Sequence, residues 1–202
     1  MQRKPDDREP DDRKPDDWAP DDLEAAVLDA NVLFPTILRE ILTDVAQAGL
    51  YRALWSERIL SEWRHAAARL GPDQDAVAGA EIALLRLRFP DAVQADDGDA
   101  AIDLDFPDDA DRHVVESALA AGAQLVITAN LRDFPQGLMA GLGLRAIHPD
   151  AFLVDLHRTD PVTVARAVHA ARDKAAAMGG AMSLGEMLKR CRLPRLAKAV
   201  KD

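Results

Sequence analysis

The sequence LVITANLRDF at residues 125–134 combines an apolar run with a polar loop. The run, Leu125–Thr128, is short and rich in β-branched residues, which is typical of a strand that is covered on both faces. Strands of this kind occur mostly in parallel sheets. The stretch therefore predicts a parallel strand that places Thr128, Asn130 and Asp133 at its carboxyl end.

Strands and helices are predicted to alternate upstream of this stretch. Ala25–Leu28 (AAVL) is a short apolar run, and residues 37–45 carry apolar side chains at helical spacing. Residues 51–55 predict a second strand, and Ser56 is a suitable N-cap for the helix that follows it. This alternation predicts an α/β fold, in which helices cover both faces of a mostly parallel sheet.

The strand signals are weaker downstream. Val93 and Ile102–Leu104 suggest a further strand, interrupted by the acidic turn DDGD, and residues 144–147 suggest a strand at the sheet edge. A helix is expected from Asp111 to Ala121. In an open parallel sheet, functional residues lie at the carboxyl ends of the strands, so the loops there are the place to search for a site.

The chain is expected to have three regions. Residues 1–22 consist largely of the repeats RKPDD, REPDD, RKPDD and WAPDD, which predict a disordered tail. Residues 23–156 form the α/β domain, and residues 157–202 are a helical region. The net charge is −5 in residues 1–24, −11 in residues 25–156 and +6 in residues 157–202. The basic region could bind RNA phosphates, pack as a helical cap or dock an acidic partner.

The composition predicts a cytoplasmic protein. The single cysteine, Cys191, excludes an internal disulfide and a cysteine-based metal site. The apolar runs are too short to span a bilayer, so no membrane association is expected. The polar, acidic N-terminus is unlike a secretory signal.

Acidic residues gather around the predicted carboxyl edge of the sheet. Asp29 directly follows the first strand in LDANVLFP, and Glu62 lies on the helix after the second strand in SERILSEW. Asp108, Asp109 and Asp111 precede a later helix in FPDDADRHVVESAL. Taken singly, each has an ordinary explanation as a turn, N-cap or solvated helix residue. Taken together with Asp133 of the loop after the LVIT strand, they predict a site for Mg²⁺ or Mn²⁺, because hard cations prefer oxygen ligands.

Such a site suits the hydrolysis of a phosphodiester. A divalent metal can activate water and offset the charge of a phosphate, whereas the acids without metal would repel a nucleic acid. His113 has no second histidine at ligand spacing, so we interpret it as a packed or surface residue and not as a ligand.

Four motifs in this order, LDANVL, SERILSEW, DRHVVESAL and ITANLRDF, resemble the PIN-domain nucleases, in the branch of VapC-like toxins from bacterial toxin–antitoxin pairs. The similarity runs from about Ala26 to Asp155, and the helical region after it resembles an extension found in one subgroup. The resemblance implies a PIN-like three-layer sandwich, with a mostly parallel central sheet flanked by helices and a helical C-terminal appendage.

The resemblance also implies a site and an activity. The catalytic acids would be Asp29, Glu62, Asp111 and Asp133. Asp29, Asp111 and Asp133 would bind Mg²⁺ or Mn²⁺, with Asp108 as a further candidate ligand. The implied activity is metal-dependent cleavage of RNA by a homodimer that a cognate antitoxin protein inhibits. The local supporting residues would be Asn31, Thr128 and Asn130.

One motif departs from the family pattern. Relatives commonly read Asp-Pro-Asp-Asp-Arg-His, whereas this chain reads FPDDADRH at residues 106–113, so that Ala110 resembles an insertion. This leaves open whether Asp108 or Asp109 shares the metal with Asp111. The Pro-Asp repeat is also foreign to the family, and its role stays open.

Two other functional classes are alternatives. Phosphatases and phospho-accepting receivers also place an Asp after the first strand. A receiver needs a Lys after a late strand, but residues 25–156 contain none, and a haloacid-type phosphatase needs a second Asp where this chain has Asn31. The other alternative is a non-catalytic PIN-like module that binds RNA or protein. The complete acidic set argues against that module.

Overall fold

The computed structural model describes residues 24–96, 98–101, 103–179 and 182–200. The Pro-Asp repeat at 1–22, with its predicted disorder, lies outside the described residues. Within the described ranges, no helix has the length and apolar character needed to cross a membrane.

A five-stranded parallel sheet lies at the centre of the fold, with strand order β3-β2-β1-β4-β5. In the register of the sheet, Val27 lies beside both Leu54 and Val126. Every residue of the central strands β1 and β4 is buried, which confirms the prediction of a sheet that is covered on both faces. The strands are β1 (Ala25–Leu28), β2 (Arg52–Ser56), β3 (Val93–Gln94), β4 (Leu125–Ile127) and β5 (Arg145–Ile147).

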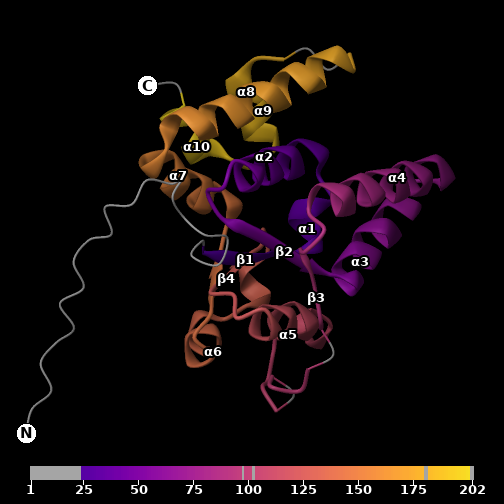
Figure 1. Cartoon of the computed structure of the whole chain (residues 1–202), viewed down its shortest axis with the longest axis vertical. Coiled ribbons are helices and arrows are strands. Elements are labelled where there is room, and N and C mark those ends of the chain that lie inside the picture. The colour runs from indigo at the N-terminus through magenta and orange to yellow at the C-terminus, as the bar shows by residue number, and fades with distance from the viewer. Residues whose placement is uncertain (1–23, 97, 102, 180–181, 201–202) are drawn as a thin grey trace, which may run out of the picture.

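Helices cover both faces of this sheet (Figure 1). Helix α2 (Thr36–Gln47) lies on one face, and α5 (Arg112–Ala120) and α6 (Gln136–Gly141) lie on the other. The short helix α1 (Ala30–Leu33) connects β1 to α2. A helical hairpin of α3 (Glu57–Ala68) and α4 (Pro72–Arg88) projects from the side of the sheet. The arrangement is the predicted α/β sandwich.

A further helical layer packs on α2 through α8. Within this layer, the buried carboxylate of Asp150 accepts hydrogen bonds from the backbone N–H groups of Arg195 (3.1 Å) and Leu196 (2.9 Å), which joins α7 to the start of α10. The basic C-terminal region therefore packs as a helical cap, and the predicted boundary between residues 156 and 157 falls inside α7. The helices of this layer are α7 (Pro149–Thr159), α8 (Pro161–Ala177), α9 (Leu184–Arg190) and α10 (Pro194–Ala199).

One predicted strand is wrong in extent. Strand β3 ends at Gln94, and Asp103 and Leu104 lie in a turn, while Ile102 is outside the described residues. Among the described residues of this segment, only Val93 and Gln94 pair with β2. Beyond that point the acidic side chains of the loop favour solvent over a place in the sheet. The loop instead leads to the 3₁₀ turn η3 (Asp109–Asp111), so α5 begins one residue later than predicted.

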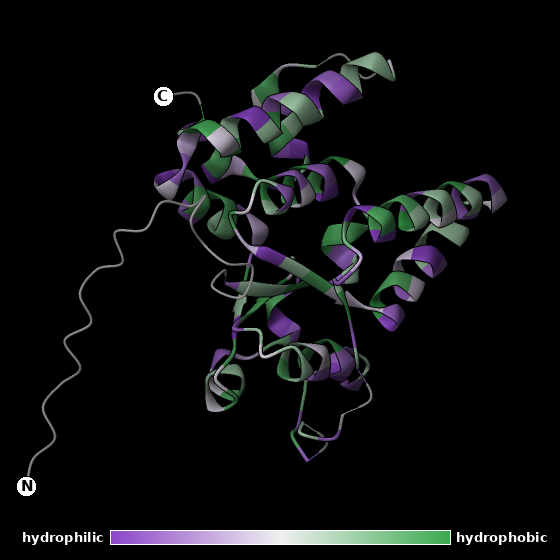
Figure 2. Ribbon diagram, viewed as in Figure 1, coloured by the Kyte–Doolittle hydropathy of each residue, from purple (hydrophilic) through white to green (hydrophobic). Residues whose placement is uncertain are grey.

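Hydrophobic residues lie along the strands and along the helices that cover them (Figure 2), and those in the core are buried. Trp55 of β2 and Trp63 of α3 are among the largest fully or almost fully buried side chains. Ser56 caps α3 as predicted, because its Oγ accepts a hydrogen bond from the backbone N–H of Ile59 at 3.2 Å. The position of α3 beside β2 is therefore fixed at its first turn.

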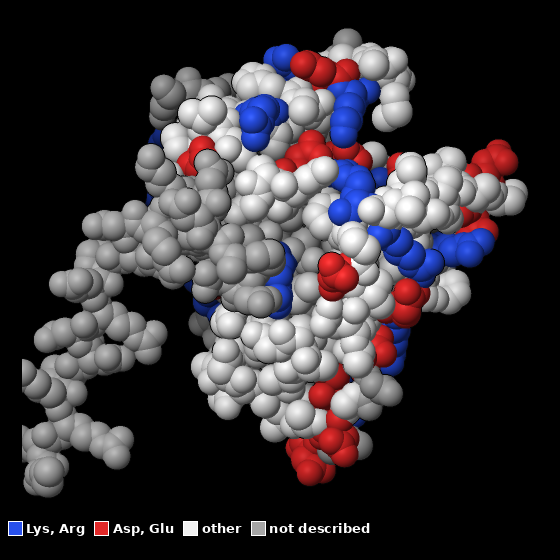
Figure 3. Space-filling model, in the orientation of Figure 1, with Lys and Arg blue, Asp and Glu red and all other residues white. Residues whose placement is uncertain are grey.

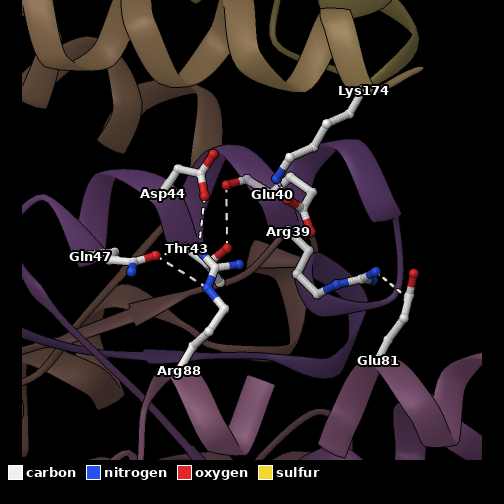
Figure 4. Close-up of polar contacts among 8 residues, drawn as sticks. All are labelled: Arg39, Glu40, Thr43, Asp44, Gln47, Glu81, Arg88 and Lys174. Carbon is white, nitrogen blue, oxygen red and sulfur yellow. Dashed lines mark hydrogen bonds and ion pairs between the residues drawn. The ribbon is translucent and has the colours of Figure 1, made fainter. Parts of the chain in front are cut away.

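Polar contacts connect α2 to α4 and α8 (Figure 4). Arg88 of α4 donates from Nη2 to Asp44 Oδ1 and to Gln47 Oε1, both at 2.8 Å. Lys174 of α8 forms an ion pair with Glu40 of α2. These contacts fix the two outer helices against α2 at the edge of the core.

Arg39 of α2 is buried, with 3% of its surface exposed, and it joins three elements. Its Nη1 donates to the backbone oxygens of Leu33 (2.6 Å) and Phe34 (3.3 Å) at the end of α1. Its Nη2 forms an ion pair with Glu81 of α4 (Figure 4), and its guanidinium carbon lies 4.4 Å from the centre of the Trp63 ring. Burial lowers the pKa of Arg39 and the carboxylate of Glu81 opposes this change, so the group stays charged.

Candidate active site

The first predicted acid, Asp29, lies at the junction of β1 and α1. It is the N-cap of α1 and is 5% exposed. Its Oδ2 accepts hydrogen bonds from Thr128 Oγ1 at 2.7 Å and from the side-chain amide of Asn31. Burial raises the pKa of Asp29 above its ordinary value, and the hydrogen bonds from the Thr128 hydroxyl and the Asn31 backbone N–H offset only part of this rise. The protein thus fixes one carboxylate oxygen of Asp29 at the carboxyl end of β1, the central strand of the sheet.

Asn31 and Thr128 connect the ends of the neighbouring strands β1 and β4. The Asn31 amide nitrogen donates to Thr128 Oγ1 at 3.0 Å, and Asn31 Oδ1 accepts a hydrogen bond from the backbone N–H of Ala129 at 2.9 Å. The backbone N–H of Asn130 donates to Thr128 Oγ1 at 3.0 Å, and the Asn130 side chain donates to Asp133. The three predicted supporting residues therefore form one hydrogen-bonded path from Asp29 to Asp133.

The predicted acids share one open pocket of about 610 Å³. It is formed by the ends of β1 and β4, the η3 turn and the outer part of α3. All four predicted catalytic acids line it, together with the further candidate Asp108. The complete acidic lining is Asp29, Glu62, Asp108, Asp111 and Asp133.

The acids in this pocket affect the ionisation of one another, and Asp111 shows this most clearly. Burial and then the negative charges of Asp29, Asp133 and Asp108 raise the pKa of Asp111 to about 7. Asp111 therefore holds its proton at a pH where an exposed carboxyl group has lost it. A cation in the pocket would reverse this effect, because it favours the charged carboxylate.

This pKa predicts how stability depends on pH when no metal is present. The pKa of Asp111 is about 7 in the folded state, whereas its ordinary value is 3.8. Between these two pH values the unfolded chain has released the proton that the folded protein still holds, so the folded state becomes less stable as the pH rises. The free energy of unfolding in EDTA should therefore fall between about pH 4 and pH 7. Asp111→Asn should remove much of this fall. Denaturant titrations of both proteins across this range measure it, and parallel curves would contradict the assigned pKa.

Glu62 has a partner that the sequence did not indicate. Its Oε1 lies 2.8 Å from Nε2 of His113 and 3.4 Å from Nε of Arg58. His113 is 3% exposed, so its interpretation as a packed residue is confirmed, but its position against a predicted catalytic acid was missed. The contact joins α5 to α3, and only the tertiary structure brings these two helices together.

The structure distinguishes Asp108 from Asp109, the two candidate acids between which the sequence motif with Ala110 did not decide. Asp108 lines the pocket, and its Oδ1 caps the η3 turn by accepting a hydrogen bond from the backbone N–H of Ala110 at 2.9 Å. Asp109 does not line the pocket. Its side chain is 77% exposed and pairs with Arg112 at 2.7 Å. Both belong to an acidic loop between β3 and α5 over which red side chains gather in Figure 3.

A family model described as the PIN domain matches residues 25–132, which is more than half of the chain. The chain belongs to the PIN domain family. The match includes the segments that carry Asp29, Glu62 and Asp111, and it ends one residue before Asp133.

A curated relative of this PIN domain is the "Putative ribonuclease VapC50" of Mycobacterium tuberculosis. The two are 40% identical over 45 residues, which is 22% of this chain and 27% of that protein. The chain thus aligns with about a quarter of the relative's length. No solved structure matches the chain significantly.

The side chains of this PIN domain fit the divalent metal that the resemblance implies. The pocket offers carboxylate oxygens from separate segments, and burial together with the neighbouring acids raises the pKa of Asp111. Among the described residues, no group of three or more His, Cys, Asp or Glu side chains is already arranged as a metal site. Asp29 and Asp133 are instead hydrogen-bonded to the neighbouring side chains of Thr128 and Asn130.

The PIN domain pocket also has residues that the sequence did not single out. Trp63, Arg69 and Leu70 of the α3 segment line it, as does Phe34 at the end of α1. Trp63 and Leu70 were visible in the sequence only as apolar residues. Their position on the wall that holds Glu62 depends on which face of α3 turns toward the sheet.

Proposed function

We propose that this PIN domain is a metal-dependent endoribonuclease that cleaves RNA phosphodiesters. The observation that carries the proposal is the convergence of five carboxylates from four separate segments on one open pocket at the carboxyl edge of the sheet. The relative named as a ribonuclease supports RNA as the substrate. The proposed catalytic acids are those expected from the sequence: Asp29, Glu62, Asp111 and Asp133.

Asp29, Asp111 and Asp133 are the proposed ligands of Mg²⁺ or Mn²⁺, with Asp108 beside them. When bound, such a cation neutralises charge on the phosphate and makes water a stronger nucleophile. The hydrogen bonds from Asn31 and Thr128 fix the Asp29 carboxylate before substrate arrives. This arrangement reduces the reorganisation that ligand binding would otherwise require.

Glu62 is the proposed general base. It lines the pocket from α3, where His113 and Arg58 contact its Oε1 and leave the other oxygen for the attacking water. Water would add to phosphorus as Glu62 takes its proton, and the bond from phosphorus to one bridging oxygen would break. The departing oxygen would then take a proton from solvent.

The proposal is tested with the full chain and a labelled RNA of random sequence. Cleavage should appear with Mn²⁺ or Mg²⁺ and stop when EDTA is added, because the acids alone repel the RNA backbone. The same metals should also raise the melting temperature, since a ligand that prefers the folded state stabilises it. Cleavage at an equal rate in EDTA would reject the metal-dependent mechanism.

The resemblance of the four sequence motifs to VapC-like toxins also supports a role as the toxin of a toxin–antitoxin pair. In that role, the cognate antitoxin and a second copy of the chain are the proposed protein partners. The exposed apolar side chains Val77, Leu84 and Leu87 of α4 offer a surface for contacts of this kind. Purification together with the product of a neighbouring reading frame would test the antitoxin, and light scattering would test the dimer.

A further inference from the structure

One positively charged side chain lines the acidic pocket. Arg69 follows the last turn of α3 and is the single Lys or Arg among the described residues of the lining. Its neighbours in the pocket include the five carboxylates already described. An RNA strand that approaches these acids therefore meets one cationic group in the same pocket.

Arg69 differs from the nearby arginines in having no carboxylate partner among the residues that the structure describes. Arg58 pairs with Glu62, Arg64 pairs with Asp75 at 2.8 Å, and Arg112 pairs with Asp109 at 2.7 Å. Within the described part of the chain, the Arg69 guanidinium forms no hydrogen bond or ion pair, although it lies in a pocket of acids. Its donors are free to bind an external anion.

Apolar side chains line the same pocket as this guanidinium. Leu70, the next residue, is 67% exposed and lines the same pocket, and so does the half-buried ring of Phe34. An exposed leucine at the mouth of a pocket favours contact with an apolar surface. The face of an unpaired base is such a surface, and aromatic rings bind bases with little dependence on sequence.

We propose that Arg69 and Leu70 form a binding site for a nucleotide of single-stranded RNA next to the phosphate that is cleaved. The guanidinium binds a backbone phosphate through two parallel N–H donors, while Leu70 and Phe34 contact the unpaired base of that nucleotide. This inference rests on the proposed function for its substrate. It adds residues that bind the substrate without taking part in the chemistry.

The placement also explains why one arginine can serve this role without disabling the site. A cation paired with Asp29 or Asp111 would compete with the divalent metal for the same oxygens. Arg69 contacts none of these acids through a described ion pair, so it attracts phosphate and leaves the carboxylates available. Arg also suits the geometry of a phosphate better than Lys, because its planar fork offers paired donors.

The test measures RNA binding apart from cleavage. Fluorescence anisotropy of a short labelled single-stranded RNA of random sequence is followed in Ca²⁺ at several salt concentrations, and a gel verifies that the RNA stays intact. Arg69→Ala should raise Kd about tenfold, as expected for about 1.4 kcal/mol of lost binding. The slope of log Kd against log salt should fall by about 0.7, the value for one phosphate contact on a single strand.

Arg64→Ala is the matched control, because it removes the same charge from the same helix at an exposed position paired with Asp75. Its Kd and salt slope should equal those of the wild type. Arg69→Lys should keep the salt slope and recover part of the affinity. Leu70→Gln should weaken binding without changing the slope, and duplex RNA should compete poorly.

The result separates this inference from the proposed function. If Arg69→Ala binds RNA as Arg64→Ala does, or if the wild type does not bind RNA, the inference is overturned. If Arg69→Ala weakens binding while the wild type fails to cleave RNA with Mn²⁺, the binding site stands and the proposed function fails. Where cleavage occurs, Arg69→Ala should raise KM and leave kcat unchanged, because its contact is made equally in the ground and transition states.

Discussion

Asp29→Asn is expected to lower the rate of metal-dependent RNA cleavage by about 1,000-fold, because loss of metal binding removes several kcal/mol of transition-state stabilisation. Asp29 is the acid that the structure fixes most firmly, since Thr128 and Asn31 donate to its Oδ2. Asn keeps the size of the side chain and its ability to cap α1, but it removes the negative charge. Cleavage of a labelled RNA in Mn²⁺, measured under single-turnover conditions, gives the rate.

Two further measurements show whether the charge itself is responsible. Asp155→Asn removes an acid from the surface of α7, where it pairs with Arg158, and should cleave RNA at the wild-type rate. Mn²⁺ should raise the melting temperature of the wild type but not that of Asp29→Asn. If Asp29→Asn cleaves as fast as Asp155→Asn, the observed activity comes from another site or another protein.

Arg39→Ala is expected to lower the free energy of unfolding by about 3 kcal/mol. This is the lower end of the range for removing one partner of a buried ion pair, because the Glu81 side chain that remains is 33% exposed. The change leaves Glu81 without its partner, removes the donors to the backbone oxygens of Leu33 and Phe34, and opens space beside Trp63. Denaturant unfolding monitored by tryptophan fluorescence and by circular dichroism measures the effect.

Arg86→Ala supplies the comparison, because Arg86 also pairs with a glutamate across two helices. The side chains of Arg86 and Glu57 are 47% and 61% exposed, so loss of this pair should cost less than about 1 kcal/mol. Arg39→Met tests the apolar part of the interaction, since it keeps a long side chain on Trp63 but no donor. Equal unfolding free energies for Arg39→Ala and Arg86→Ala would show that burial adds nothing to the Arg39 contacts.

The strands that end just before Asp29 and Thr128 were both predictable, for a physical reason. A strand buried in a parallel sheet must be apolar along its whole length, so the first polar residue after it marks the carboxyl end. Asp29 and Thr128 stand at those positions, and their strands are neighbours in the sheet. The short strand β3 was predicted too long, because apolar residues such as Leu104 also occur in loops.

The sequence alone therefore determined the α/β class, the edge of the sheet that carries the site and the main acidic candidates. These properties depend on local patterns of apolar and polar residues within single segments. The tertiary structure alone decided that Asp108 and not Asp109 lines the pocket, that His113 contacts Glu62, and that Arg69 lines the pocket with no ion-pair partner among the described residues. These outcomes depend on how far each helix is rotated about its axis when distant segments pack, and the spacing of residues in one segment does not determine that rotation.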